Sequence, residues 1–369
     1  MSTPFPPEEG IGYYVYNLSK KLVSNGHEVT VVTRGMKKIL IDDVQGIKVV
    51  KLPFLGLYPF HIQLHGRHVN RYLKEHENEF DLIHVHTPLS PVPKTRLPIV
   101  STVHTSVIGD SKHINVVDSK SLSIKIFSPT MGKYLVSKLI KKSCMVMTVS
   151  AAIAEELEVF YNLSNAIVVG NGFNRDEFSN HFTTKRRNYL LYVGRLSYRK
   201  GVSDLIKAIQ SLQKENKIEL IICGKGEIKD ELNNYINNNN LNKYISLKGH
   251  VERDELVSLY YGAQAFVLPS HYEGLPTTLL EAMAAGCPVI VSDIPAIRGL
   301  IEDGVSGLIF PKGSVRHLSE KILTIINDDS LANRLGIEGQ RRVFSDYTWD
   351  DISNRILECY NIIIGGMSD

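Results

Sequence analysis

The strongest chemical signal in this chain is a pair of glutamates eight positions apart, Glu273 and Glu281. Between them, Pro276 and two threonines predict the start of a helix, whose first N–H groups have no partner inside the helix. Such groups attract phosphate oxygens, so we expect the amides near Thr278 and Leu279 to face an anionic ligand. Because carboxylates repel phosphate, the glutamates are expected to accept hydrogen bonds from sugar or ribose hydroxyls. The pattern predicts a sugar-nucleotide site.

An alternative explanation of the same residues needs no ligand. Thr278 and Glu281 also match the Ser/Thr-x-x-Glu capping box that closes a helix start. Two glutamates at a fixed spacing also recur by chance. The pair alone therefore leaves both explanations open.

A second segment predicts a phosphate-facing loop. Residues 189–193 form an apolar run typical of a buried strand, and residues 201–214 follow with a helical pattern. Between them, Gly194 lets the backbone turn, Arg195 can grip two oxygens with its planar fork, and Lys200 supplies a mobile point charge. A diphosphate would use both cations. The alternative is two solvated surface side chains.

A third segment places Gly224 and Gly226 after another apolar run. A Gly-x-Gly pair can let a backbone approach a phosphate. Tight loops also use glycine for their own geometry, so the pair is a weak signal by itself.

A histidine in the amino-terminal half is a further candidate. His104 ends an apolar run, and a residue at the carboxyl end of a parallel strand points into the crevice where ligands bind. The alternative is a core histidine satisfied by a backbone group. His84 and His86 alternate with apolar residues, and we interpret them as structural.

In this order and spacing, the segments resemble the retaining glycosyltransferases of family 4, which have the GT-B architecture of two Rossmann-like domains. The match is most specific over residues 189–313, where Gly-Arg-x4-Lys-Gly, Gly-x-Gly and Glu-x7-Glu all occur. In the amino-terminal half it is looser, and the corresponding segments are Glu9-Gly10-Ile11-Gly12, Gly26-His-Glu-Val29, His104 and Asn171-Gly-Phe-Asn174.

The resemblance implies transfer of a sugar from a UDP-sugar or GDP-sugar to an acceptor hydroxyl, with retention of the anomeric configuration. Arg195, Lys200 and the amides at the helix start would stabilise the departing diphosphate. Glu281 would hold the ribose, Glu273 would orient the transferred sugar, and His104 would contact that sugar from the opposite domain. No Asp-x-Asp occurs, so neither a metal nor a cofactor is expected.

The resemblance also places Gly10, Gly194 and Gly224 against the donor. One residue departs from the family pattern, because Glu9 stands where many relatives carry glycine. How closely this loop approaches the donor phosphates is therefore open.

The 369 residues suit two domains better than one. We expect an amino-terminal domain at 1–174, a polar linker at 175–188, a nucleotide-sugar domain at 189–346 and a helix at 347–369 that packs back on the first domain, with an interdomain cleft. Apolar runs that alternate with helical patterns predict parallel α/β sheets. The expected strands are 28–33, 47–52, 82–86, 98–103, 145–149, 166–169, 189–193, 218–223, 244–248, 265–268, 288–292 and 307–310.

The amino terminus lacks a strand that the family pattern contains. The helix expected at Ile11–Leu22 follows a loop at residues 4–10, and only three residues precede that loop. Relatives place a hydrophobic strand there, at the centre of the sheet. Loss of this strand would expose the edges of both neighbours, so we hypothesise that the true start lies upstream.

Composition agrees with a globular cytoplasmic protein. Hydrophobic content of 43% and charged content of 22% are ordinary, and four isolated cysteines predict neither a disulfide framework nor a zinc site. No apolar run reaches the ~18 residues of a membrane span. Nucleic-acid binding is disfavoured because the small net charge of +3 arises from one local cluster.

That cluster lies at residues 112–142, a segment with seven lysines and only one acidic residue. Met131, Leu135 and Leu139 form an apolar stripe at helical spacing, and a basic amphipathic helix can lie on an anionic membrane. This favours a lipid-linked acceptor. The alternative is an apolar face packed on its own domain. The apolar loop at 52–60 is either a second membrane contact or local core.

Three functions follow from these observations. The first is a glycosyltransferase that builds a glycolipid, a lipid-linked oligosaccharide or a surface polysaccharide, peripheral on the cytoplasmic face of the membrane. The second is an enzyme of the same fold with a soluble acceptor. The third is a non-catalytic subunit that binds a sugar nucleotide.

Overall fold

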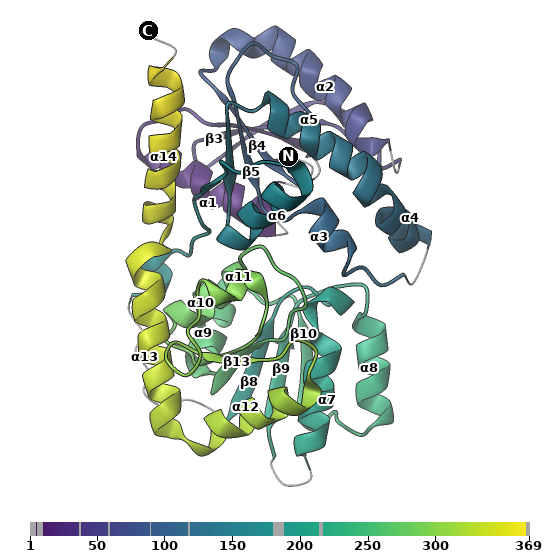
Figure 1. Cartoon of the computed structure of the whole chain (residues 1–369), viewed down its shortest axis with the longest axis vertical. Coiled ribbons are helices and arrows are strands. Elements are labelled where there is room, and N and C mark those ends of the chain that lie inside the picture. The colour runs from purple at the N-terminus through teal and green to yellow at the C-terminus, as the bar shows by residue number, and fades with distance from the viewer. Residues whose placement is uncertain are drawn as a thin grey trace. The chain divides into compact units, whose positions relative to one another are not determined.

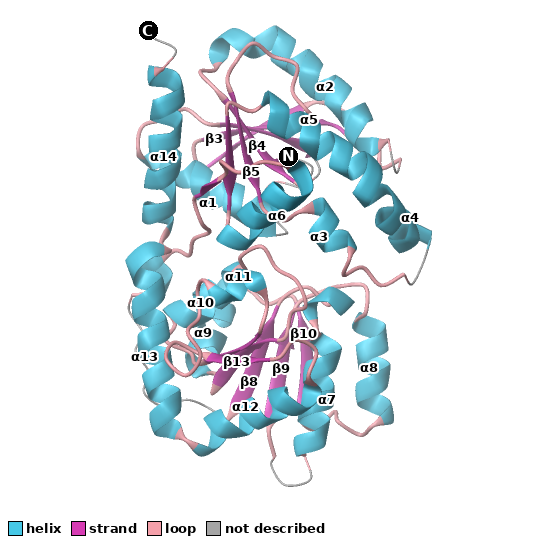
Figure 2. Cartoon of the chain, in the orientation of Figure 1, coloured by secondary structure: helices cyan, strands magenta, loops and turns pink. Residues whose placement is uncertain are grey.

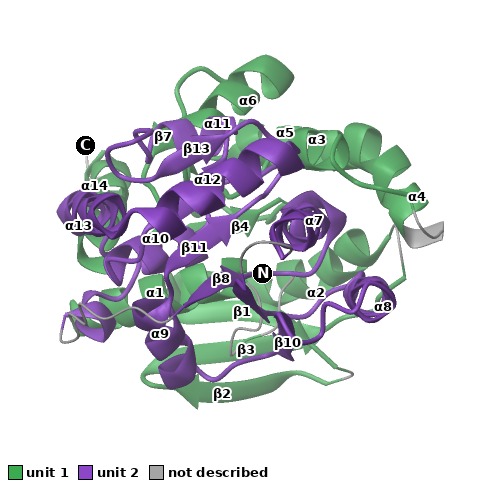
Figure 3. Ribbon diagram, turned by 90° about the horizontal axis from the view of Figure 1, so that it is seen from below, with its two compact units in different colours: residues 1–172, 349–369 green, residues 173–348 purple. Residues whose placement is uncertain are grey.

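The structure is a computed structural model in which the chain forms two compact units (Figures 1 and 3). Unit 1 comprises Met1–Gly172 and Trp349–Asp369, and unit 2 comprises Phe173–Thr348. Of the expected linker, residues 175–178 form a 3-10 helix (η3), whereas residues 180–187 lie outside the described residues. The structure describes residues 5, 10–36, 38–57, 60–88, 90–116, 119–179, 188–213 and 217–366.

Unit 2 is built on a six-stranded parallel sheet with the order β10-β9-β8-β11-β12-β13. Figure 2 draws the strands in magenta and labels β8, β9, β10 and β13 of this sheet. The chain starts in the middle at β8, moves outward to β10, and then returns to pair β11 with the other edge of β8. The direction of winding therefore reverses between β8 and β11. The strands are β8 Tyr189–Val193, β9 Glu219–Cys223, β10 Ile245–Gly249, β11 Ala265–Leu268, β12 Val289–Ser292 and β13 Leu308–Phe310.

The core of unit 2 follows from the periodicity of its sequence. Every residue of β8 is buried, as in a strand covered by helices on both faces. The helix after β8 buries residues at helical spacing, among them Leu205, Ile206 and Ile209. The helices are α7 Val202–Leu212, α8 Lys229–Asn238, α9 Arg253–Gly262, α10 Thr277–Ala284, α11 Pro295–Arg298, α12 Val315–Asn327 and α13 Asp329–Asp346.

The described residues of unit 1 form two sheets. In the first, β1 pairs with β3 in parallel and β3 pairs with β2 antiparallel; in the second, β4, β5, β6 and β7 are parallel. Within the described residues, no strand pairs with the outer edge of β1 or β4. The strands are β1 Thr30–Gly35, β2 Leu40–Val44, β3 Ile47–Pro53, β4 Ile83–Thr87, β5 Ile99–Val103, β6 Met145–Thr148 and β7 Ile167–Val168.

The expected strands are confirmed, but β2 was not predicted. β2 is an edge strand whose side chains are mostly exposed, so it lacks the apolar run used to recognise the others. Its signal was the turn, because Gln45 and Gly46 both have positive φ, as in a two-residue hairpin loop.

The C-terminal helix α14, Trp349–Gly365, belongs to unit 1 and packs on α1, Gly10–Ser24. The rings of Tyr14 and Trp349 meet edge to face with centroids 4.9 Å apart. Lys21 and Asp350 form an ion pair at 2.5 Å. Unit 1 also contains α2 His61–His76, η1 Glu77–Glu79, α3 Val107–Ser111, α4 Ser119–Phe127, the π-helical segment η2 Ser128–Gly132, α5 Lys133–Lys142 and α6 Ala151–Tyr161.

Candidate functional site

The loops that follow β8 and β11 meet at the point where the sheet reverses its winding. In open α/β sheets, ligands bind beyond the carboxyl ends of the strands at such a point. Gly201 ends the first loop with a φ of +65°, and a Cβ there would lie 2.0 Å from the carbonyl oxygen of Pro269 in the second loop. The His271 N–H also donates to the Arg199 carbonyl at 2.8 Å. Glycine at 201 therefore allows the contact that brings the two loops together.

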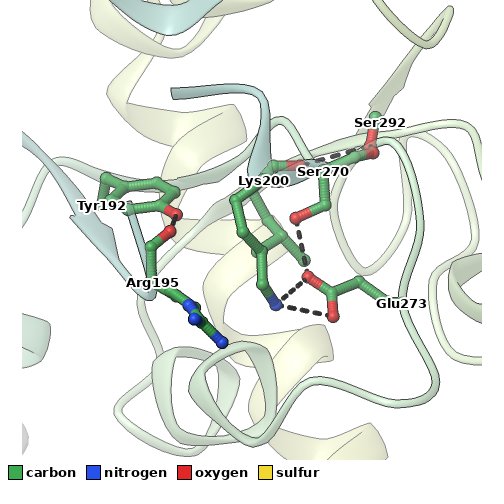
Figure 4. A network of polar contacts seen from close by, with 7 residues as sticks. Tyr192, Arg195, Lys200, Ser270, Glu273 and Ser292 are labelled. Atoms are coloured by element: carbon green, nitrogen blue, oxygen red, sulfur yellow. Dashed lines mark hydrogen bonds and ion pairs between the residues drawn. The ribbon is translucent and has the colours of Figure 1, made fainter. Parts of the chain in front are cut away.

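This contact joins Lys200 to Glu273 (Figure 4). The Lys200 ammonium donates to both carboxylate oxygens of Glu273, at 2.6 and 2.8 Å. Ser270 donates a third hydrogen bond to the same carboxylate at 2.7 Å, and its own carbonyl accepts a hydrogen bond from the Ser292 hydroxyl. The side chains of Lys200 and Glu273 are only 16% and 7% exposed. Two residues predicted from separate motifs thus form one buried ion pair.

The charge of Glu273 is set by two opposing effects. Burial raises the pKa of its carboxyl group, but the positive charges of Lys200 and Arg199 and the hydrogen bonds from Lys200 and Ser270 outweigh burial and lower that pKa overall. Glu273 is therefore a carboxylate at neutral pH. As a carboxylate it can accept hydrogen bonds from hydroxyl groups, and its contact with a sugar stays a prediction.

Arg195 lies in the same loop but is open to solvent. Its side chain is 62% exposed, and its guanidinium lies 3.5 Å from Glu227. The Tyr192 hydroxyl donates to the Arg195 carbonyl at 2.9 Å, which fixes the backbone beneath the side chain. An accessible fork on a fixed backbone can grip phosphate oxygens.

The glycines of this region have packing reasons. A Cβ at Gly224 would lie 1.9 Å from the Gly194 carbonyl oxygen, and one at Gly226 would lie 2.0 Å from the Leu196 carbonyl oxygen. These glycines let the loop after β9 lie against the loop after β8. Gly194 itself has a φ outside the positive range, so the sharp turn expected there does not require glycine. A Cβ at Gly194 would instead lie 3.0 Å from the Tyr192 hydroxyl oxygen, so Gly194 and Gly224 both have packing reasons that need no donor.

Helix α10 starts where predicted, but without a capping box. Pro276 is its N-cap residue and no side chain caps it, so Thr278 and Glu281 do not form the reciprocal bonds of that motif. The Leu279 N–H donates to the Pro276 carbonyl at 3.2 Å, whereas Thr278 belongs to the first turn, whose N–H groups have no acceptor within a helix. Of the two amides predicted to face phosphate, the Leu279 amide is therefore already engaged.

Glu281 lies in the second turn of α10, and both of its oxygens are already bound. Counted from Thr277, it is the fifth residue of α10 and not part of the opening turn. Its Oε1 lies 2.9 Å from Arg253 Nη1, and its Oε2 accepts from the Tyr260 hydroxyl at 3.1 Å. Burial raises the pKa of Glu281, and the attraction of Arg253 reduces this effect without cancelling it.

Sequence reasoning missed four residues of this site: Ser270, Arg253, Tyr260 and Glu177. Ser270 stands three positions before Glu273, close enough to have been considered as a hydrogen-bond donor. Arg253 and Glu177 are joined across 76 positions, and no local pattern marks such a pair.

In unit 1, His104 lies just after β5 in a cluster of buried rings. His86 Nδ1 and His104 Nε2 are 3.2 Å apart, and the Tyr14 ring lies edge to face with His104 at 4.6 Å. His84 contacts the hydroxyls of Tyr360 and Thr102 at 2.6 and 2.7 Å. Burial lowers the pKa of His104 and that of His84 to about 3, so both rings are neutral at neutral pH. The contact between His104 and a donor sugar stays a prediction.

The remaining predicted residue, Gly10, begins α1. A Cβ at Gly10 would meet nothing within 4 Å, so the described structure shows no steric need for glycine there. Glu9, the departure from the family pattern, lies outside the described residues. The approach of this loop to a donor stays a prediction.

The apolar stripe predicted in the lysine-rich segment faces the interior of unit 1. Leu139 is buried and Met131 and Leu135 are half-buried, so on α5 the packed alternative is correct. Other apolar side chains of this segment are exposed, among them Ile126 and Tyr134. Within the part of the chain that the structure describes, no helix has both the length and the apolar character needed to cross a bilayer.

Comparison with known proteins gives matches along most of the chain. The family model described as Glycosyltransferase Family 4 matches residues 9–177, and the model described as Glycosyl transferases group 1 matches residues 173–342. A glycosyltransferase of Methanocaldococcus jannaschii is 26% identical over 97% of this chain and 96% of its own length. The phosphatidyl-myo-inositol mannosyltransferase of Mycolicibacterium smegmatis is 26% identical over 96% of this chain and 91% of its own.

Solved structures show the same fold. The sucrose-phosphate synthase of Thermosynechococcus elongatus superposes with a TM-score of 0.81 at 19% identity, over 97% of this chain and 94% of that chain. At this level of identity the likeness concerns the fold alone.

Proposed function

The chain belongs to the group 1 and family 4 glycosyltransferases, and from this premise we propose that it transfers a sugar from a nucleoside diphosphate sugar to an acceptor hydroxyl with retention of configuration. The observation that carries the proposal is the buried pair of Lys200 and Glu273 at the carboxyl ends of β8 and β11. A charged carboxylate can bind sugar hydroxyls there, while Lys200 and the accessible Arg195 face the diphosphate.

The difficult step is the departure of the nucleoside diphosphate. The bond from the anomeric carbon to the phosphate oxygen breaks, and negative charge develops on the leaving group as the sugar becomes oxocarbenium-like. In the proposed reaction Arg195, Lys200 and the first-turn amide of Thr278 stabilise that charge, and no metal is required. The acceptor oxygen then bonds to the anomeric carbon on the same face, and its proton passes to the leaving phosphate.

Glu273 is better suited to orientation than to nucleophilic attack. Three hydrogen bonds, two from Lys200 and one from Ser270, already bind its oxygens and lower their basicity. In the proposed reaction Glu273 holds the sugar hydroxyls, and the leaving phosphate assists attack by the acceptor.

Donor choice and activity can be tested together. The full chain is screened by thermal shift with UDP, GDP and their hexose derivatives, because a ligand of the folded state raises its stability. Release of nucleoside diphosphate from the stabilising donor is then measured with and without EDTA. Turnover that survives EDTA and disappears in Glu273→Ala supports the proposal. Donor binding without turnover in the wild-type chain would favour a non-catalytic subunit.

We further propose a lipid-linked acceptor. The mycobacterial relative is named for a phosphatidylinositol acceptor, and unit 1 exposes apolar side chains near lysines. Ile126 and Tyr134 lie exposed in the segment that contains Lys125, Lys133 and Lys138. Each lysine near an anionic surface adds about 1 kcal/mol of attraction.

The loop at residues 52–60 adds a second apolar surface to unit 1. Leu52 is buried, whereas Leu55, Leu57 and Phe60 are exposed, so only the start of this loop is core. Its residues 58–59 lie outside the described residues.

Vesicle sedimentation distinguishes lipid-linked from soluble acceptors. We expect the full chain to sediment with vesicles of phosphatidylglycerol and phosphatidylcholine, less so at high salt, and not with phosphatidylcholine alone. The variant Lys133→Glu/Lys138→Glu should remain in the supernatant. Equal behaviour with both vesicle types would favour a soluble acceptor.

A further inference from the structure

Arg253 joins two acidic side chains of unit 2 that come from different elements. It is the first residue of α9, and its Nη1 lies 2.9 Å from Glu281 Oε1 on α10. On its other side, Nε donates to Glu177 Oε2 at 2.8 Å, and Nη2 contacts the same oxygen. The guanidinium therefore lies between a carboxylate of the candidate site and one of η3.

Arg253 is itself held in place from the side of η3. Asn174 donates to the second oxygen of Glu177 at 3.0 Å, which fixes that carboxylate. The Phe178 ring lies 5.8 Å from the guanidinium carbon of Arg253. With one edge of the fork fixed, the direction of Nη1 toward Glu281 is fixed as well.

Arg253 favours the charged form of Glu281 against the effect of burial. The Glu281 side chain is only 14% exposed, and burial raises the pKa of its carboxyl group. Three groups face it: Arg253 and the Tyr260 hydroxyl from α9, and Glu177 from η3. Without Arg253, a neutral hydroxyl and a like charge would remain, and the pKa of the buried carboxyl group would rise further.

The hydrogen-bonding capacity of Glu281 matches a ribose. A carboxylate has about four lone-pair sites on its two oxygens. Arg253 occupies one site on Oε1, and Tyr260 occupies one on Oε2. One site on each oxygen remains, and a ribose in a nucleoside diphosphate offers two neighbouring hydroxyls as donors.

We propose that Arg253 is a positioning residue for nucleotide recognition, which holds Glu281 charged and directs its two remaining acceptor sites toward the 2′- and 3′-hydroxyls of the donor ribose. This inference rests on the proposed function, in which Glu281 binds the ribose. Arg253 acts through Glu281 and does not itself contact the reacting atoms.

The test compares ribose with deoxyribose ligands. Calorimetric titration of the full chain with UDP and 2′-deoxyuridine diphosphate, or with GDP and its 2′-deoxy form, gives the preference for ribose. We expect the wild-type chain to prefer the ribonucleotide by at least about tenfold, as for a hydrogen bond to a charged group. In Arg253→Met the ribonucleotide should bind at least about tenfold more weakly, and the 2′-deoxynucleotide, which keeps only the 3′-hydroxyl contact with Glu281, should lose less affinity.

A pH series provides a readout that a merely structural role would not change. In Arg253→Met, affinity for the ribonucleotide should rise from pH 6 to pH 9 as Glu281 loses its proton, while affinity of the wild-type chain for the same ligand changes less. Arg253→Lys restores a charge without the two-sided fork, and should give an intermediate preference. Arg316→Met, which removes an exposed arginine paired with Glu320 on α12, is the matched control.

The outcomes separate this inference from the proposed function. A wild-type chain that binds no nucleoside diphosphate contradicts the proposed function itself. Equal affinity of the wild-type chain for the ribonucleotide and the 2′-deoxynucleotide would overturn the role of Arg253. So would an Arg253→Met variant that keeps the full preference for the ribonucleotide. Thermal unfolding checks that Arg253→Met is folded. If it is not, Arg253→Lys decides, because an undiminished preference in that variant contradicts the directed fork.

Discussion

Replacing Lys200 by methionine isolates the ion pair on which the proposed site depends. The substitution keeps the length of the side chain and removes the ammonium that lies 2.6 and 2.8 Å from the Glu273 oxygens. Arg199 and the Ser270 hydroxyl remain near a carboxyl group that is almost fully buried. Burial then outweighs the remaining attraction, so the pKa of Glu273 should move from below its usual value of 4.5 to above it.

The effect of Lys200→Met on the free energy of unfolding follows from this change in pKa and depends on pH. In the wild-type chain, the lowered pKa of Glu273 contributes stability above pH 4.5 that is lost as the pH falls through the folded-state pKa. In Lys200→Met the raised pKa has the opposite sign, because holding the carboxyl group protonated costs more as the pH rises above 4.5. Each pH unit above 4.5 adds about 1.4 kcal/mol to the cost of holding this carboxyl group protonated. The loss of folding free energy from this effect is therefore at most about 3.4 kcal/mol at pH 7 and about 0.7 kcal/mol at pH 5.

Urea denaturation followed by far-UV circular dichroism at pH 5 and pH 7 measures this difference. We expect Lys200→Met to lose up to about 2.7 kcal/mol more, relative to wild type, at pH 7 than at pH 5. In a Glu273→Gln background the same substitution should have an effect that does not change with pH. A loss that is equal at both pH values, or a pH dependence that survives in the Glu273→Gln background, would refute the reasoning.

Three further predictions address other parts of the chain. Glu273→Gln should reduce transfer at least about 100-fold while nucleoside diphosphate binding stays within about threefold, which turnover assays and calorimetry would show; unchanged turnover would contradict the role of the charge. Gly224→Ala should lower the melting temperature, because its Cβ would meet a carbonyl oxygen at 1.9 Å, whereas Gly299→Ala, which meets nothing within 4 Å, should not. The pKa of His84 is about 3, below its usual 6.5, so unfolded chains take up protons first and stability falls as the pH drops below 6.5. His84→Gln should remove about 2 kcal/mol of the stability that is lost between pH 7 and pH 5. Unfolding followed by the fluorescence of Trp349 at both pH values measures this loss, and an unchanged pH dependence would argue against a neutral buried ring.

The sequence predicted the strands of both units but not the order of those strands within each sheet. Runs such as Leu190–Val193 are apolar on both faces, and this pattern depends only on local sequence. The return of the chain from β10 to pair β11 with β8 depends on packing between distant segments. The exposed strand β2 was missed because edge strands need no continuous apolar face.

The candidate site shows the same division between local and long-range information. Lys200 and Glu273 each belong to a recognisable motif, and their convergence follows from the position of each motif after a strand. The contacts of Arg253 were hidden because they join side chains from three separate elements. The sequence also did not show that Arg253 and Tyr260 each bind one oxygen of Glu281, which leaves fewer acceptor sites for a ligand.

A crystal structure of the full chain with whichever of UDP and GDP stabilises it tests the central claim most directly. We predict that the diphosphate lies beyond the carboxyl ends of β8 and β11, within hydrogen-bonding distance of Lys200 Nζ and the Arg195 guanidinium, with the ribose hydroxyls on Glu281. A nucleotide bound elsewhere, or one that leaves these three side chains without contact, would contradict that claim.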